Sequence, residues 1–196
     1  MVEGPSGEPG ARPGRRDEIA LMLETLAHRG PDGEGIVEAG PAALGHRRLA
    51  VIDLSERASQ PMALRCAGSE TNPSIWIVFN GEIYNFPELR RELSGRGHQF
   101  HSDSDTEVIL HLYEEEGERC LPRLKGMFAF ALWDGRTRRL LLARDRVGKK
   151  PLYYRRTAEG LQFASEIKAL ARLAHLHGQA LTEDPAALRA YLALKY

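Results

Sequence analysis

The sequence contains little cysteine and no long hydrophobic run. Its 196 residues include only two cysteines, Cys66 and Cys120. Two cysteines cannot build a disulfide framework, which favours a reducing compartment. The longest unbroken apolar run, Met127–Trp133, is far shorter than the ~20 residues of a membrane-spanning helix. These absences predict a cytoplasmic protein that does not enter a membrane.

An excess of charge of one sign is also lacking. The 27 Lys and Arg residues balance the 27 Asp and Glu residues, so the formal net charge is +0. A protein without a net positive field has no overall attraction for a phosphate backbone, and we therefore expect no nucleic-acid partner. Hydrophobic residues make up 42% of the chain, which is enough to build the core of one globular domain.

The chain divides into three parts. Residues 1–16 are rich in Gly, Pro and Arg and are predicted to be disordered, because they carry too little apolar surface to offset the entropy of ordering. Residues 17–180 show periodic apolar patterns and are expected to form the domain. Residues 181–196 are expected to begin a linker and a helix, since Asp184-Pro185 is a helix start signal.

Stretches of helix and stretches of strand follow one another within the domain. Helices are predicted to begin near Asp17, Pro87, Asp105 and Glu166. Strands are predicted over Leu49–Ile52, Ile75–Phe79, Met127–Trp133, Arg139–Arg144, Pro151–Tyr154 and Leu161–Ala164, with hairpin turns at Asp134-Gly135 and Gly160. This order of blocks predicts an α+β fold with antiparallel sheets.

One predicted turn carries the most suggestive chemistry. The strand Ile75–Phe79 is followed by Asn80, Gly81 and Glu82. The Asn80 amide and the Gly81 N–H can direct two donors at one oxyanion, and a glycine lets the backbone approach a ligand closely. Glu82 adds a negative charge for an ammonium group. The alternative is an ordinary turn, because Asn-Gly is a common turn dipeptide.

Two further residues supply the remaining charges that an amino acid needs. The Arg48 guanidinium, just before the predicted strand Leu49–Ile52, can bind a carboxylate through two hydrogen bonds. Asp105 offers a second acceptor for an ammonium group. The plainer interpretations are an exposed arginine and a helix cap. Together with Asn80 and Gly81, these charges suit an α-amino acid that bears a side-chain amide.

Signals for a metal site or a reactive cysteine are weak. The closest histidine clusters, His98-x-x-His101 and His175-x-His177, match no zinc-binding spacing, so we expect no metal. Neither cysteine has a histidine placed by the sequence to activate it, and both are expected to be unreactive.

Several longer strings of residues occur in a fixed order along the chain. They are His28-Arg29-Gly30-Pro31-Asp32-Gly33, Gly45-His46-Arg47-Arg48-Leu49-Ala50-Val51-Ile52-Asp53, Gln60-Pro61-Met62, Phe79-Asn80-Gly81-Glu82-Ile83-Tyr84-Asn85, Ser104-Asp105-Thr106-Glu107, Gly126-Met127-Phe128-Ala129-Phe130-Ala131, Arg144-Asp145-Arg146-x-Gly148-x-x-Pro151-Leu152-Tyr153-Tyr154 and Phe163-Ala164-Ser165-Glu166-x-Lys168-Ala169-Leu170. The series resembles the N-terminal class II glutamine amidotransferase domain of glutamine-dependent asparagine synthetases, a domain of the N-terminal-nucleophile hydrolase type. The resemblance runs from about Asp17 to the last residue.

The resemblance implies an αββα sandwich of two antiparallel sheets flanked by helices. It implies that glutamine is hydrolysed to glutamate and ammonia, and that a synthetase domain uses ATP and Mg²⁺ to join this ammonia to aspartate, giving asparagine. It implies no cofactor within the present domain. Carried over by motif, Arg48 would bind the glutamine carboxylate, Asn80 and Gly81 would form the oxyanion hole, and Glu82 and Asp105 would orient the amino acid and its ammonium group.

The chain departs from the family pattern in two places. The family begins Met-Cys-Gly-Ile with the cysteine as nucleophile, whereas Met1 is followed here by Val2. No residue is therefore assigned as the nucleophile, and the first strand is expected to be missing or replaced. The Ser-Gly-Gly-x-Asp-Ser loop of the synthetase domain does not occur in the sequence.

We therefore expect the glutaminase domain of an asparagine-synthetase-type enzyme, truncated and unable to hydrolyse glutamine by itself. The expected partners are glutamine or glutamate, a synthetase domain in the same or a separate chain, and a second copy in a homodimer. The alternatives are a non-catalytic scaffold or glutamine-binding module, like those of the β-lactam synthetases and lasso-peptide cyclases that lack the cysteine, and a decayed fragment.

Overall fold

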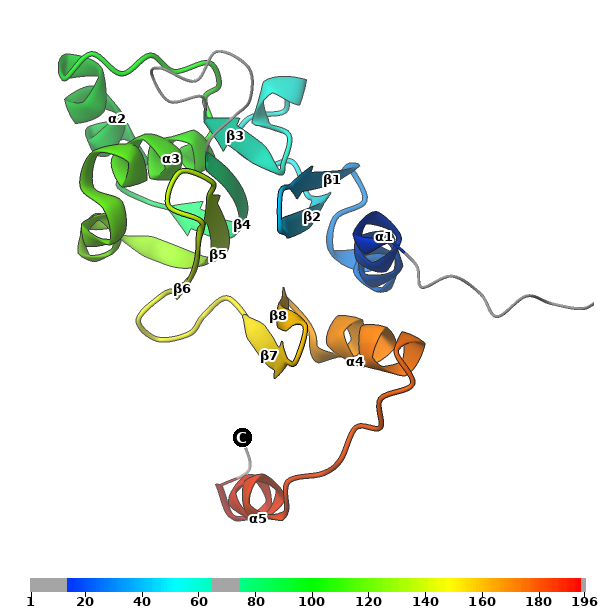
Figure 1. Cartoon of the computed structure of the whole chain (residues 1–196). Helices are drawn as coiled ribbons and strands as arrows, with labels where there is room; N and C mark the ends of the chain where they lie inside the picture. The colour runs from blue at the N-terminus through cyan, green and yellow to red at the C-terminus, as the bar shows by residue number, and fades with distance from the viewer. Residues whose placement is uncertain (1–13, 65–74, 195–196) are drawn as a thin grey trace, which may run out of the picture.

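A four-stranded antiparallel sheet forms the centre of the computed structural model, which describes residues 14–64 and 75–194 (Figure 1). Its strands, in spatial order, are β3 (Met62–Leu64), β4 (Ile75–Ile83), β5 (Gly126–Asp134) and β6 (Arg139–Arg144). The register of the central pair places Phe79 of β4 opposite Phe130 of β5. The expected α+β class with antiparallel strands is confirmed.

Both faces of this sheet are buried. Successive residues of a strand point to opposite faces, and Ile77 and Phe79 belong to the main apolar core while Val78 belongs to a separate apolar cluster. A strand that is covered on both faces needs apolar residues at successive positions. This requirement explains the continuous apolar run in β5, where Phe128 to Trp133 are all buried.

Helices cover one face of the sheet. They are α2 (Phe86–Gly95), α3 (Asp105–Glu116) and the 3-10 helix η3 (Gly117–Arg123). The hydroxyl of Ser104 caps α3 by accepting a 3.2 Å hydrogen bond from the Thr106 N–H. Ile109 and Leu112 of α3 are fully buried in the main core, so this helix is fixed firmly against the sheet.

Two hairpins and two helices lie on the other side. They are α1 (Arg15–Thr25) with the short helix η1 (Ala27–Arg29), the hairpin of β1 (Gly33–Ala39) and β2 (Ala42–Arg48), the hairpin of β7 (Tyr153–Thr157) and β8 (Gly160–Ala164), and α4 (Ile167–Leu176). Leu44 of β2 packs against Val78 and Trp133 of the central sheet. Met22 of α1 packs against Leu170 of α4. The helix η2 (Glu56–Ala58) lies between β2 and β3 in the sequence.

The last helix, α5 (Pro185–Leu194), stands apart from the rest (Figure 1), and all its residues are exposed.

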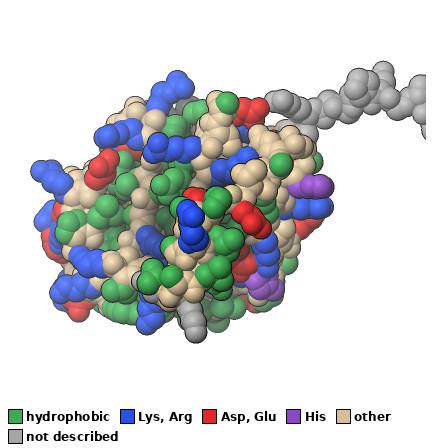
Figure 2. All heavy atoms as spheres, turned by 90° about the horizontal axis from the view of Figure 1, so that it is seen from below, with side chains coloured by type: hydrophobic (Ala, Val, Ile, Leu, Met, Phe, Trp, Pro, Cys, Tyr) green, Lys and Arg blue, Asp and Glu red, His purple; other side chains and the backbone are tan. Residues whose placement is uncertain are grey.

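On the face seen in Figure 2, Lys and Arg side chains are spread among exposed hydrophobic side chains and do not gather in one basic patch. Among the described residues, no helix has the length and apolar character needed to cross a membrane.

Two strand predictions are wrong. The strand β4 does not end in a turn at Asn80, because it continues to Ile83 and pairs Asn80 with Ala129. The segment Leu49–Ile52 is not a strand, since β2 ends at Arg48. This segment has no neighbouring strand among the described residues, and its Ala50 N–H donates instead to the side chain of Asp32 at 2.9 Å.

The sheets and the chain ends also differ in detail from expectation. The described residues form three antiparallel sheets, because the β1–β2 and β7–β8 hairpins are not hydrogen-bonded to each other, whereas the resemblance implies two sheets. Helix α1 begins at Arg15, two residues before the predicted start. Most of the segment predicted to be disordered, and Cys66, lie outside the described residues.

Candidate functional site

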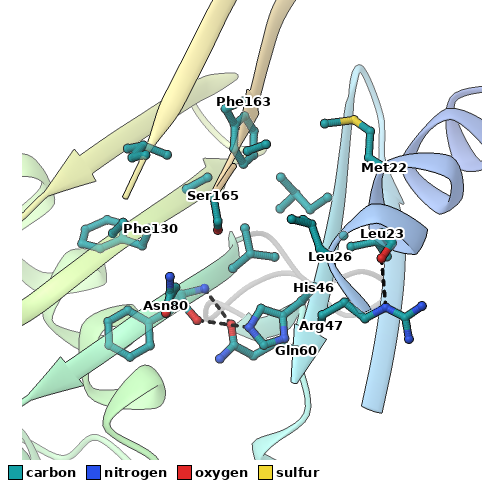
Figure 3. A pocket seen from close by; sticks show the side chains of 18 of the residues that line it. Met22, Leu23, Leu26, His46, Arg47, Gln60, Asn80, Phe130, Phe163 and Ser165 are labelled. Carbon is teal, nitrogen blue, oxygen red and sulfur yellow. Dashed lines mark hydrogen bonds between the residues drawn. The ribbon is translucent and has the colours of Figure 1, made fainter. Parts of the chain in front are cut away.

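A cavity of about 820 Å³ lies between the central sheet, the two hairpins and α1. In Figure 3, Met22, Leu23 and Leu26 lie on one side of it, and Phe130 and Asn80 lie on the other. Its volume is in the range of small-molecule binding sites. The five residues predicted to handle glutamine all line this cavity: Arg48, Asn80, Gly81, Glu82 and Asp105.

The side chain of Asn80 offers the cavity an unused donor. Its Nδ2 atom is buried and has no hydrogen-bond partner. A buried polar group without a partner costs about 1–3 kcal/mol, so this atom favours a ligand that brings an acceptor. The side chain extends from β4 in the cavity wall (Figure 3).

The backbone N–H of Gly81 points to the edge of β4 that faces away from β5. Phe128, which lies opposite Gly81 in the register, uses both its N–H and its C=O to bond Asp145, at 3.2 and 2.7 Å. Residues directly opposite in an antiparallel pair either both bond each other or both point away. The N–H of Gly81 therefore points away from β5. Its neighbours on that edge, the N–H groups of Phe79 and Ile83, are occupied by side chains.

Glycine is required at position 81 by the packing of the two strands. A Cβ atom there would lie 2.1 Å from the carbonyl oxygen of Met127, and the φ angle of +155° is one that other residues rarely adopt. The sequence predicted that Gly81 lets the backbone approach a ligand closely. In the structure, Gly81 lines the cavity and also allows the close approach of the neighbouring strand β5.

Arg48 is held at the end of β2 by two contacts. Its Nη2 donates to the carbonyl of Asp53 at 2.5 Å, and its Nη1 lies 3.5 Å from the hydroxyl of Ser59. A guanidinium has five N–H donors, so others remain for a ligand. The carboxylate of Asp53 accepts a 2.9 Å hydrogen bond from the N–H of Asp103, two residues before Asp105. These bonds bring Arg48 and the start of α3 to the same end of the cavity.

Two carboxylates lie at that end. Asp105 is only 4% exposed, and its Oδ2 accepts a 2.8 Å hydrogen bond from the N–H of Ile83. Burial raises the pKa of Asp105; the hydrogen bond from Ile83 opposes this shift, and the negative charge of nearby Glu82 adds to it. A positively charged ligand group placed between the two carboxylates would offset their mutual repulsion and favour the ionised form of Asp105.

Two lining residues received no role from the sequence. Gln60 accepts a 2.7 Å hydrogen bond from the Phe79 N–H, and His46 contacts the Phe79 carbonyl through Nε2 at 3.2 Å. Burial lowers the pKa of His46 to about 4, so the ring is neutral and its buried, unpartnered Nδ1 is a free acceptor. Both residues stand in the strings that carry the resemblance, but nothing in the sequence indicates that they face the cavity.

No cysteine of the described residues reaches the cavity. Cys120 lies in η3 and is fully buried in the main core. Burial raises the pKa of its thiol to about 12, so the thiol stays protonated at neutral pH.

The histidine spacings from which no metal site was expected do not describe how the histidines group in space. His98 lies beside His111 and Glu114, outside the cavity, and the exposed His101 is not part of this group. The sequence analysis did not bring these three residues together.

Comparison with known proteins places the chain in a family. Residues 7–196 match the glutamine amidotransferase domain family. Asparagine synthetase [glutamine-hydrolyzing] 3 of Bacillus subtilis is 47% identical over 154 residues, which cover 79% of this chain and 24% of the relative. Asparagine synthetase [glutamine-hydrolyzing] 3 of Arabidopsis thaliana is 42% identical over 158 residues, which cover 80% of this chain and 26% of the relative. The chain thus spans about a quarter of the length of these relatives.

A solved structure supports the same assignment. Glutamine phosphoribosylpyrophosphate amidotransferase from B. subtilis, in complex with ADP and GMP, superposes with a TM-score of 0.69 at 26% sequence identity. The match covers 80% of this chain and 41% of that chain. The resemblance drawn from the ordered strings is confirmed, and the chain belongs to the glutamine amidotransferase domain family, in the form found at the N-terminus of asparagine synthetases.

Proposed function

We propose that this chain is the glutamine-binding domain of an asparagine-synthetase-type enzyme and that it does not hydrolyse glutamine by itself. One observation carries the first part of the proposal. Arg48, the Asn80–Gly81 pair, Glu82 and Asp105 line a single cavity in which the Asn80 amide is buried and unpaired.

The chemistry of glutamine matches the arrangement of these groups. The free donors of Arg48 suit the α-carboxylate, and the adjacent carboxylates Glu82 and Asp105 suit the α-ammonium. The side-chain carbonyl would then accept hydrogen bonds from Asn80 Nδ2 and the Gly81 N–H. Glutamate offers the same carboxylate and ammonium, so we propose that it binds at the same place.

The second part of the proposal concerns the nucleophile. In the part of the chain that the structure describes, the cavity lining includes no cysteine, and Cys120 is buried elsewhere with its thiol protonated. Attack on an amide by a thiolate needs such a group within reach of the oxyanion donors. We therefore expect glutamine to bind and remain intact.

A synthetase domain is the proposed partner, in the same chain or a separate one. Helix α5 supports this proposal, because Leu188, Tyr191 and Leu192 are 45%, 58% and 66% exposed and form an apolar surface with no described neighbour. ATP and Mg²⁺ would act in that partner domain. We also propose a cytoplasmic location, where a free thiol such as Cys120 stays reduced.

Calorimetry and an ammonia assay test the two parts separately. Glutamine and glutamate, titrated to tens of millimolar into the purified chain, should bind with a dissociation constant of roughly 1 mM, while D-glutamine gives no heat. If neither L-amino acid gives heat while circular dichroism shows a folded chain, the binding proposal is wrong. Release of ammonia by a homogeneous sample would disprove the proposed lack of hydrolysis.

The second candidate function is a non-catalytic scaffold that binds a synthetase domain. The exposed apolar residues of α5 favour it equally. A scaffold has no need to bind glutamine, so saturable and stereospecific glutamine binding would decide for the first candidate.

A further inference from the structure

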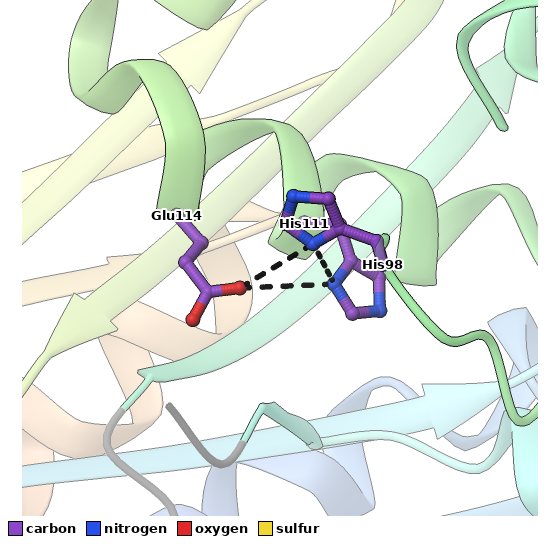
Figure 4. A group of neighbouring side chains, drawn as sticks. All are labelled: His98, His111 and Glu114. Carbon is purple, nitrogen blue, oxygen red and sulfur yellow. Dashed lines mark hydrogen bonds and ion pairs between the residues drawn. The ribbon is translucent and has the colours of Figure 1, made fainter. Parts of the chain in front are cut away.

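Two histidines and a glutamate converge on the helical side of the central sheet. His98 lies in the segment between α2 and α3, and His111 and Glu114 lie on α3 itself (Figure 4). None of the three lines the cavity. His111 follows Asp105 by six residues, which is about 9 Å along the helix, so the cluster is separate from the proposed glutamine site.

The three ligand atoms form a compact triangle. The Nδ1 atoms of His98 and His111 are 3.0 Å apart, and Oε2 of Glu114 lies 3.6 Å from the first and 3.8 Å from the second. A point equidistant from these three atoms lies roughly 2.0 Å from each, which is the bond length of zinc to nitrogen and oxygen ligands. All three atoms are therefore within reach of one ion.

The outer nitrogens of both rings face carboxylates. Nε2 of His98 lies 2.8 Å from Oε1 of Glu115, and Nε2 of His111 lies 3.7 Å from Oε1 of Glu107 and is buried without a hydrogen-bond partner. A carboxylate oxygen favours the proton on the ring nitrogen to which it is hydrogen-bonded. Glu115 therefore favours the form of His98 with the proton on Nε2, which leaves a lone pair on Nδ1 of His98.

One proton joins the two rings on their inner side. The 3.0 Å contact between the Nδ1 atoms is a hydrogen bond in which one nitrogen donates and the other accepts, and the Glu114 carboxylate lies on the third side of this pair. A metal cation can displace this proton, because it binds the lone pairs of both nitrogens and the carboxylate oxygen together. The carboxylates behind the rings resemble the outer partners that orient metal-binding histidines. A cation can bind all three converging ligand atoms at once, whereas a single proton cannot.

We propose that His98, His111 and Glu114 bind a divalent transition-metal ion of the zinc type. Two imidazole nitrogens and one carboxylate oxygen are ligands that suit zinc and its neighbours, whereas Mg²⁺ and Ca²⁺ prefer oxygen alone. The His98 and Glu114 side chains are 12% and 24% exposed, which leaves a route for the ion and a position for a water ligand. The ion would fasten the segment after α2 to the middle of α3.

Zinc binding by the whole, untagged chain tests the proposal. After treatment with a chelator, the wild type should bind one zinc ion in a calorimetric titration. Cobalt bound in its place should give visible absorption bands. His98→Ala should weaken binding by more than about 100-fold, and Glu115→Gln, which removes only an outer partner, by about tenfold. The matched control is His101→Ala, an exposed histidine three residues from His98, which should bind as the wild type does.

Three results would overturn the proposal. They are a wild-type chain that takes up no zinc, equal affinity in the wild type and His98→Ala, and an equal loss in the His101→Ala control. Glu114→Gln provides a second test if His98→Ala fails to fold, because Glu114 is a partly buried residue of α3 and glutamine has nearly the same shape as glutamate. A histidine pair whose shared proton zinc cannot displace belongs to the first of these results.

Discussion

The carboxylate of Asp105 accepts a 2.8 Å hydrogen bond from the backbone N–H of Ile83. This bond joins the first residue of α3 to the last residue of β4. The Phe79 N–H, four residues earlier on the same edge, is bonded in the same way by Gln60 at 2.7 Å. The Gly81 N–H lies between these two on the same edge, and both Gly81 and Asn80, whose amide is unpaired, line the cavity. Two side chains thus occupy the edge of the strand on either side of the Gly81 N–H.

Replacing Gly81 with alanine should destabilise the protein strongly. The new Cβ would meet the Met127 carbonyl oxygen at 2.1 Å, so β4 and β5 would have to move apart. We expect the free energy of unfolding, measured by urea denaturation, to fall by about 3 kcal/mol or more. The matched control is Gly95→Ala at the end of α2, where a Cβ meets nothing within 4 Å and stability should stay equal or rise by up to ~1 kcal/mol. Equal stability of Gly81→Ala and the wild type would contradict the strand packing.

Arg48→Ala should weaken glutamine binding strongly while the fold persists. Arg48 is a half-buried residue at the end of β2, and its loss removes the cation proposed to bind the ligand carboxylate. Loss of a charge-assisted hydrogen bond costs about 1.5–3 kcal/mol, which predicts an affinity at least about tenfold weaker in calorimetry. Arg91→Ala, on the exposed side of α2, is the control and should bind normally. A wild-type affinity in Arg48→Ala would show that the carboxylate binds elsewhere.

Local signals predicted the local parts of the fold. The turn at Asp134-Gly135 follows from its own residues, because the Asp134 carboxylate accepts the Arg136 N–H at 2.9 Å within the turn itself. Asn80-Gly81 carries a similar turn signal, yet the glycine serves the approach of β5, which is more than 40 residues away in the sequence. The pairing of His98 with His111 depends in the same way on how the segment after α2 folds back, and no sequence spacing encodes it.

Asp145 should make the stability of the domain depend on pH in the acid range. Burial alone would raise the pKa of Asp145, but hydrogen bonds from four backbone N–H groups lower it from 3.8 to about 2. A carboxyl whose pKa is lower in the folded state stabilises that state above pH 3.8, and this contribution is lost as the pH falls from about 4 to 2. The wild type should therefore exceed Asp145→Asn in unfolding free energy at pH 6, and the difference should shrink by pH 2.5. A difference that is equal at both pH values would contradict this role.

Asp105→Asn should separate the affinity for glutamine from the stability of the fold. Burial raises the pKa of Asp105, so the carboxylate that would hold the ligand ammonium becomes protonated at a higher pH than an ordinary aspartate, and wild-type affinity should fall early as the solution is acidified. In Asp105→Asn the affinity for glutamine at pH 8 should be about tenfold weaker, and its fall on acidification should begin at a lower pH.

The same substitution should affect the stability of the fold in the opposite direction. A carboxyl whose pKa is raised in the folded state stabilises that state at low pH and destabilises it once the carboxyl is ionised. The asparagine carbonyl can still accept the Ile83 N–H, so the melting temperature at pH 8 should stay the same or rise. A variant that loses stability at pH 8 but keeps its glutamine affinity would show that Asp105 holds the fold and not the ligand.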